Sequence, residues 1–208
     1  MSGVEVVGLI SAIIGIVETI ANVYSSLKDA ENLPRAFRKV AERLPLVRET
    51  LRTAEKQVEC NADEEAYQAI KTVLEKCKVK AEHLEEIFKA VVPSEGTSRF
   101  DRYRMAARRL GKGNQVEELA KDMMEDVRLL AENRAVQAAT EAQVVQLVEA
   151  IKDLSSMEPS LPDEDFSISQ SHYGYGDNVA GNKYSGNHNV YSGSGTANFG
   201  PVTNHGRN

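Results

Sequence analysis

The chain has 208 residues, of which 41% are hydrophobic and 27% are charged, and its net charge is −6. This length fits one domain of ordinary size plus a tail, and the composition is typical of a soluble globular protein, which excludes a wholly disordered or membrane-spanning chain. The negative net charge argues against a general nucleic-acid binder, so we expect no nucleic-acid partner.

The first predicted helix, residues 4–27, is apolar on nearly every face over residues 6–17. Such a helix is usually buried centrally or placed in a membrane, and we expect it to be the central helix of a bundle. The twelve uncharged residues span roughly 18 Å against a hydrocarbon core of about 30 Å, which is too short for a constitutive anchor. Burial in the monomer is compatible with release to a membrane when several copies assemble. Gly8 and Gly15 share one face, where they would permit close contact with another helix.

Two amphipathic helices are predicted next, at residues 32–59 and 63–92. Pro34 fits the first turn of the first, Pro45 predicts a kink in it, and the second stops before Pro93. Both carry apolar residues at helical spacing, so each should bury one face. These residues are Phe37, Val40, Leu44, Val47 and Leu51, then Tyr67, Ile70, Leu74, Cys77, Leu84, Ile87 and Phe88.

A short basic helix follows at residues 99–111 and ends on Gly111. It holds a single acid, Asp101, in a chain that is acidic as a whole. Two interpretations are open: the cations bind lipid headgroups or other phosphates, each giving about 1 kcal/mol near an anionic membrane surface, or they form a solvated face paired with neighbouring acids. The cations are Arg99, Arg102, Arg104, Arg108, Arg109 and Lys112.

The last helical pattern, residues 114–154, predicts either two helices or one long helix that curves over the bundle. No strand pattern occurs before the tail. The fold class is therefore all-α, a helical bundle followed by a tail.

Nothing in the bundle predicts an enzyme. His83 lies in a charged helix and is expected to be a solvated surface residue, and the pair Glu117 and Glu118 is expected on an exposed helix face. Cys60 and Cys77 form neither a zinc motif nor a disulfide framework, which indicates reduced thiols in a cytosolic protein. We expect no catalytic residue, no metal and no cofactor.

Composition changes sharply near Ser155. We place a helical bundle at residues 1–155, a Pro-containing acidic linker at 156–169 and a Gly/Asn-rich tail at 170–208. From residue 166 to the end the charged residues are Asp177, Lys183 and Arg207. Such neutrality removes the repulsion that would oppose stacking of identical chains.

The tail is expected to be disordered in the monomer because it holds too little apolar surface to bury, and to form cross-β amyloid on assembly. Pro201 would interrupt a strand near its end. A flexible tail with no function of its own is the alternative. The candidate amyloid residues are Asn178, Val179, Gly181, Asn182, Tyr184, Gly186, Asn187, Asn189, Val190, Tyr191, Gly195, Thr196, Asn198 and Phe199.

The stretches "GLISAIIGIVETIANVYSSL", "LPRAFRKVAERLPLVRETL" and "RRLGKGNQVEELA" together resemble a known family. They are similar to the N-terminal domain of fungal NACHT-type receptors, of the SesA or HeLo-like kind. The resemblance covers residues 1–154. It implies a helical bundle that occurs either fused to a P-loop ATPase or alone with a short amyloid motif.

The resemblance further implies a programmed-cell-death effector of the incompatibility type, which serves fungal innate immunity. A matching motif on a NACHT or NLR-type receptor would template the prion-like tail into amyloid. The helical domain would then self-assemble and leave the cytoplasm for the plasma membrane, where its first helix would perturb the phospholipids. The residues implied in membrane targeting are Val6, Val7, Leu9, Ile10, Ile13, Ile14, Ile16, Val17 and Ile20. The alternative is a non-toxic adaptor that binds such a receptor through its helical surface.

Overall fold

The computed structural model describes residues 3–27, 32–60, 64–92, 96–133, 136 and 141–162. These residues contain six helices and no strands, so the predicted all-α fold is confirmed for them. The helices, all within the unit Met1–Ser167, are α1 (Gly3–Ser26), α2 (Arg35–Cys60), α3 (Glu64–Ala90), α4 (Arg99–Leu110), α5 (Val116–Glu132) and α6 (Glu141–Ser155). The tail, with every candidate amyloid residue, lies outside the described residues.

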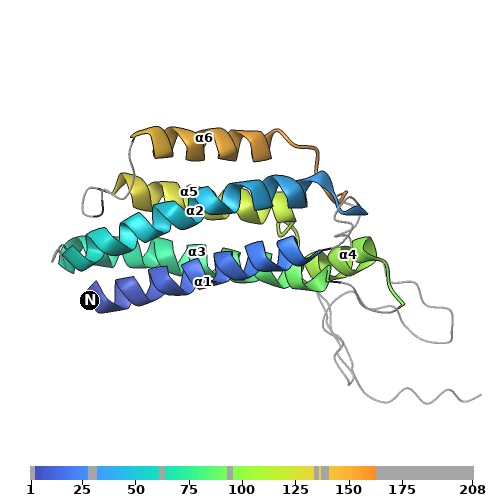
Figure 1. Cartoon of the computed structure of the whole chain (residues 1–208), viewed down its shortest axis with the longest axis horizontal. Coiled ribbons are helices and arrows are strands. Elements are labelled where there is room, and N and C mark those ends of the chain that lie inside the picture. Colours follow the sequence, from blue (N-terminus) through green and yellow to red (C-terminus); the bar gives the residue numbers. More distant parts are fainter. Residues whose placement is uncertain are drawn as a thin grey trace, which may run out of the picture. The chain divides into compact units, whose positions relative to one another are not determined.

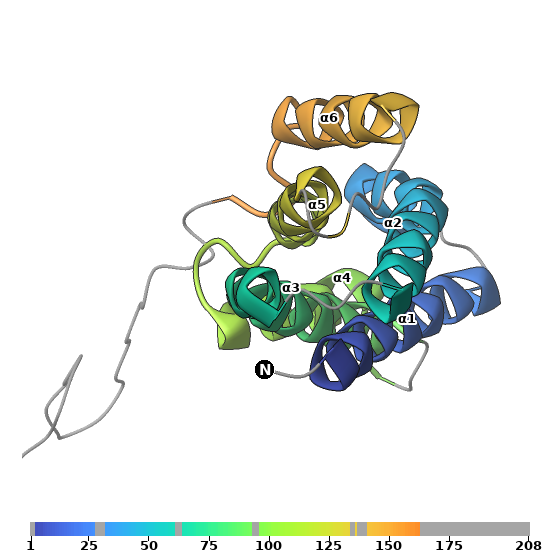
Figure 2. The same cartoon turned by 90° about the vertical axis from the view of Figure 1, so that its left-hand side faces the viewer.

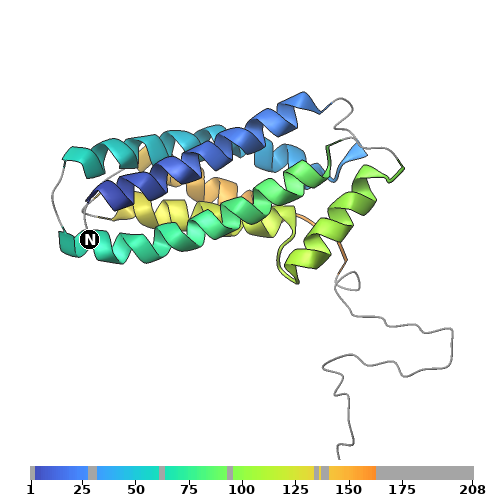
Figure 3. The ribbon, with the colours of Figure 1, turned by 90° about the horizontal axis from the view of Figure 1, so that it is seen from below.

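Helices α1, α2, α3 and α5 lie side by side and enclose the core (Figure 1, Figure 2). Helix α1 packs against α2 and α3, while α5 packs against α2, α3 and α6. Helix α6 lies over α2 and α5, and the short α4 adjoins α3 at one end of the bundle (Figure 3). The most enclosed helix is therefore α5, which buries residues around most of its circumference.

The expectation that the first helix is central is wrong. Helix α1 lies at the edge of the bundle, where two neighbouring helices cover it from one side (Figure 2). Its uncovered face carries Gly8 and Gly15, which are exposed. Because glycine has no apolar side chain, leaving these positions in water forfeits little hydrophobic free energy. A high mean hydropathy therefore does not require that a helix be surrounded.

Local signals place most helix ends where the sequence predicts them. Helix α2 begins directly after Pro34 and continues through Pro45. Helix α3 ends at Ala90, before Pro93. Helix α4 ends at Gly111, whose φ of 96° lies in the left-handed region that favours glycine.

The long pattern at residues 114–154 forms two helices, α5 and α6, which confirms the first of its two alternatives. One continuous helix of that length would span roughly 60 Å and overrun its neighbours. Folding back instead lets α6 bury Leu147, Ala150 and Leu154 over α2 and α5.

Aromatic rings link α1, α2, α3 and α4 through the core. The Phe37 ring centroid is 5.0 Å from that of Phe88 and 5.0 Å from that of Tyr103. Phe88 in turn contacts Tyr24 of α1, with 6.1 Å between ring centroids. These contacts form one continuous series from α4 to α1, in which Phe37 joins the ring of α4 to that of α3.

Candidate functional site

The residues that the sequence analysis assigned to membrane targeting form the inner face of α1. Six of them are buried and three are partly buried against the same core. At about 1.5–3 kcal/mol for each fully buried aliphatic side chain, the six contribute roughly 10 kcal/mol or more to the attachment of α1. The buried residues are Val6, Ile10, Ile13, Ile14, Val17 and Ile20, and the partly buried ones are Val7, Leu9 and Ile16.

The outer face of α1 is open. A Cβ atom added at Gly8 or at Gly15 would meet no heavy atom within 4 Å. At the N-terminal end Val4 is 80% exposed. This face therefore accepts larger side chains without disturbing the fold.

Helix α1 is long and apolar enough to cross a membrane by length and composition, the one such helix in the described part of the chain. Its 24 residues measure about 36 Å, so the whole helix exceeds the hydrocarbon thickness of about 30 Å that the uncharged run alone does not reach. The core helix of a soluble protein passes the same test. In the folded monomer the inner face of α1 packs against the core, as it does in such a core helix.

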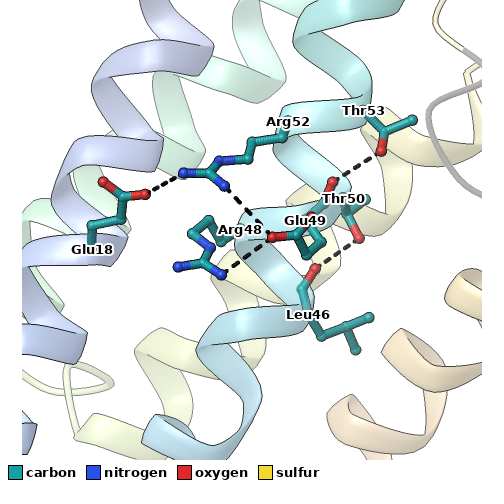
Figure 4. Close-up of polar contacts among 7 residues, drawn as sticks. All are labelled: Glu18, Leu46, Arg48, Glu49, Thr50, Arg52 and Thr53. Atoms are coloured by element: carbon teal, nitrogen blue, oxygen red, sulfur yellow. Dashed lines mark hydrogen bonds and ion pairs between the residues drawn. The ribbon is translucent and has the colours of Figure 1, made fainter.

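Few polar contacts join α1 to α2 (Figure 4). Arg52 Nη2 is 2.8 Å from Glu18 Oε1, and Arg52 Nη1 is 3.8 Å from Glu49 Oε1. Ser11 Oγ donates a hydrogen bond to Glu55 on the same side of α1. These groups are partly exposed, and exposed ion pairs contribute about 0–1 kcal/mol each.

The interface between α1 and α2 also holds an unpaired group. Among the described residues, Arg48 Nε is the one buried side-chain polar atom without a hydrogen-bond partner, although Arg48 Nη2 lies 3.2 Å from Glu49 Oε1 (Figure 4). An unpaired buried donor is unfavourable. The attachment of α1 therefore depends on its apolar face, and the polar contacts add little.

The basic segment takes part in the fold. Arg102 donates to the carbonyl oxygens of Ala90 at 2.9 Å and Val92 at 3.0 Å, and also to that of Thr97, so it caps the end of α3. Arg109 Nε donates to Glu86 Oε1 at 3.1 Å.

The other cations of this segment differ in their surroundings. Arg104 lies over the Phe100 ring, 5.5 Å from its centroid. Arg108 and Lys112 are exposed, and Arg99 is half-buried. Lipid contact by the cations of this segment stays a prediction.

The cysteines and His83 show no arrangement typical of a catalytic or metal site in the described part of the chain. Cys60 is exposed, and Cys77 is buried beside α5, where burial raises the pKa of its thiol to about 12. Cys77 is therefore protonated at neutral pH. His83 is half-buried rather than fully solvated, and its Nδ1 lies 3.2 Å from Asn114 Oδ1. No group of three or more potential metal ligands occurs among the described residues.

Glu117 corrects a second expectation, because it is 3% exposed rather than on a solvated face. Its partner comes from the segment after α6, residues 156–162, which we call the strap. Ser160 N donates to Glu117 Oε1 at 2.7 Å, and Ser160 Oγ donates to Glu117 Oε2 at 2.6 Å. The sequence pattern could not reveal this contact, since the two residues are far apart in the chain.

The strap makes two further hydrogen bonds with the bundle, through Ser160 and Leu161. The hydroxyl of Tyr103 lies 2.5 Å from Ser160 Oγ and accepts a hydrogen bond from Val116 N at 3.3 Å. Gln115 Nε2 donates to the carbonyl oxygen of Leu161 at 2.9 Å, and Leu161 is fully buried. Burial, reinforced by Glu117, raises the pKa of Tyr103, so its phenol keeps a proton to donate. The described part of the segment assigned as linker thus packs on the bundle.

Comparison with known proteins gives one match. The model of the SesA family, described as the N-terminal domain on NACHT NTPases and P-loop NTPases, matches residues 10–130. No curated protein and no solved structure matches the chain. The matched region runs from α1 into α5 and includes the interface between α1 and α2 as well as the aromatic series. Because the match extends over more than half of the sequence, the chain belongs to the SesA family.

Proposed function

We propose that this chain is a two-part effector of programmed cell death that acts with a NACHT or NLR-type receptor. Its helical bundle (1–155) is the membrane-active part, its tail (170–208) receives the signal by amyloid templating, and residues 156–169 connect them. The membership of the SesA family supports an association with NACHT NTPases. The inactive protein is cytoplasmic, and the activated assembly acts on the phospholipids of the plasma membrane.

The observation that carries this proposal is the position of α1. This helix has the length and the apolar composition of a membrane span, yet two neighbouring helices cover it from one side.

Release of α1 in isolation is disfavoured by roughly 10 kcal/mol or more, which corresponds to a negligible free population. A bilayer changes this balance because lipid chains bury the same apolar side chains again. Assembly of several copies would add contacts between their open Gly8 and Gly15 faces. The bundle is therefore inert alone and becomes active where a membrane and an assembly coincide.

The tail can be tested by itself. A peptide of residues 171–208 is expected to form thioflavin-positive fibrils with a cross-β spacing of about 4.7 Å. The reason is its near absence of charge, which leaves little repulsion between stacked copies. A peptide with Val179, Val190 and Phe199 changed to lysine is the control and should stay monomeric. Failure of the unmodified peptide to assemble at high concentration would remove the signalling role of the tail.

The second candidate is a non-toxic adaptor, and one observation favours it. All nine apolar residues assigned to membrane targeting contact the core, so the folded bundle is a complete docking domain without any release. This candidate predicts a stable complex with the receptor when the tail is deleted. It also predicts that expression of the full chain leaves yeast viability unchanged.

A further inference from the structure

The strap is built into the bundle by its side chains and by its backbone. Leu161 is fully buried, and Met157 packs against the core. The Ser160 amide and hydroxyl both donate to Glu117. Among the described residues, these are the hydrogen-bond donors that Glu117 has from outside its own helix. The strap therefore offsets part of the free-energy cost of burying the Glu117 carboxylate.

The hydrogen bonds at the strap run in one direction. Val116 N donates to the Tyr103 hydroxyl, and Ser160 Oγ donates to Glu117. Because the single hydroxyl proton of Ser160 is used in that bond, the Tyr103 hydroxyl is the donor in its contact with Ser160 Oγ. Hydrogen bonds arranged in such a series polarise and strengthen one another. Withdrawal of Ser160 would interrupt the series at its third member. The buried Glu117 carboxylate and the Tyr103 hydroxyl would then both lose their hydrogen bonds with Ser160.

The same tyrosine leads to α1. The Tyr103 ring contacts Phe37, which contacts Phe88, which contacts Tyr24 of α1. A displacement of Tyr103 therefore reaches α1 through rings that touch at each step. The strap also immediately precedes the chain that leads to the tail, so a pull on the tail acts on residues 156–162 before it acts on any helix.

We propose that the strap, residues 156–162, is a latch that holds α1 in the bundle through Tyr103 and the aromatic series, and that is withdrawn when the tail assembles. When the strap is engaged, Ser160 donates hydrogen bonds to Glu117, and the Leu161 side chain is buried against the bundle. Withdrawn, it loosens α4 and with it the end of α1 that carries Tyr24. The role of tail assembly rests on the proposed function, whereas the coupling between strap and α1 is a property of the monomer.

The test uses the full chain as a monomer, without lipid and without fibrils, and measures amide hydrogen exchange by mass spectrometry. Ser160→Asp places a second carboxylate against Glu117, at an atom now 2.6 Å away, so that like charges repel. Exchange is expected to rise at least tenfold in the strap, in α4 and in the last two turns of α1. Exchange in the C-terminal half of α2 is expected to stay within twofold of the parent chain.

A matched control and a rescue make the result specific. Ser156→Asp adds the same charge at an exposed serine of the strap and should leave exchange in α1 unchanged. Glu117→Gln combined with Ser160→Asp should restore the parent pattern, because a neutral amide can donate to the new carboxylate. Ser160→Ala, which removes the hydroxyl contacts without adding a charge, should raise exchange in the same regions about threefold.

Three results would overturn the proposal. The first is a Ser160→Asp chain whose exchange in α1 matches that of Ser156→Asp. The second is faster exchange in the strap alone. The third is a pair of findings. Adding Glu117→Gln to the Ser160→Asp chain does not restore protection, and the Ser160→Ala chain shows the same exchange in α1 as the parent chain. Because neither lipid nor fibrils are present, these results are independent of whether the bundle acts on membranes.

Discussion

A chain that carries both Gly8→Glu and Gly15→Glu is expected to fold normally and to lose all activity on membranes. Both positions face open space, so the new side chains extend into water and displace nothing. Glutamate is also a better helix former than glycine, by roughly 0.5 kcal/mol per position, so the melting temperature should not fall. Within a bilayer, however, each carboxylate near the centre of a helix costs about 2.5–3.5 kcal/mol.

Gly15 lies at the middle of α1 and Gly8 nearer its start, so the two costs together amount to roughly 3–6 kcal/mol, which lowers membrane insertion by about two to four orders of magnitude. Leakage of a dye from anionic vesicles, started by preformed tail fibrils, is the appropriate measurement. Gly8→Ala with Gly15→Ala is the matched control and should leak as the parent chain does. Parent-level leakage from the glutamate variant would show that α1 takes no part in membrane damage.

These positions separate folding from function better than the apolar face does. Ile13 is fully buried and Ile16 is partly buried. A glutamate at Ile13 would place a charge in the core and destabilise the monomer, so a loss of leakage there would have two explanations. The open face of α1, which hydropathy alone did not reveal, supplies the cleaner variant.

Phe37→Ala is expected to have the largest effect on the stability of the bundle. Its side chain is fully buried, and its ring contacts Phe88 of α3 and Tyr103 of α4. Removing a buried phenylalanine of this kind lowers the free energy of unfolding by about 3–5 kcal/mol, since both transfer free energy and packing are lost. The melting temperature should fall by roughly 10 °C or more.

Thermal and urea unfolding, followed by circular dichroism, measure this effect. Leu129→Ala, at a position that is 45% exposed, should change the free energy of unfolding by less than about 1 kcal/mol. A similarly small change for Phe37→Ala would mean that the aromatic series does not hold α2, α3 and α4 together. The latch at the strap would then lose its connection to α1.

The fold class and most helix ends follow from signals that are local in the sequence. Pro34, Pro93 and Gly111 mark ends because each restricts or permits particular backbone angles at its own position. The break between α5 and α6 has no such residue, since no glycine or proline occurs between Asn114 and Leu154. That break follows from the length of the neighbouring helices, which is a tertiary property.

The candidate site was harder to predict because it depends on contacts between distant residues. The composition of α1 identified it as exceptional, but its place at the edge of the bundle is set by its neighbours. Glu117 looked like one more surface acid because its partner, Ser160, lies in a segment with the composition of a linker. Arg102 was grouped with the basic residues although its guanidinium caps α3. Charge and hydropathy patterns report a residue's type and not its partner.

The latch and the membrane helix fit one energetic scheme. The apolar face of α1 makes spontaneous release rare, and its polar contacts with α2 contribute little. A controlled release therefore needs a change at the core rather than at the surface ion pairs. The Ser160 contacts of Glu117 and Tyr103 are a place where such a change can begin.

The central claim is that α1 moves from the bundle into the bilayer when the tail assembles. It can be measured with an environment-sensitive fluorophore at Gly15→Cys, in a chain that also carries Cys60→Ser because Cys60 is exposed. Cys77 stays unlabelled because its side chain is buried. With anionic vesicles that contain a lipid-bound quencher, the fluorophore should report water before tail fibrils are added and strong quenching afterwards. Leakage that develops while the fluorophore at position 15 remains in water and unquenched would contradict the account.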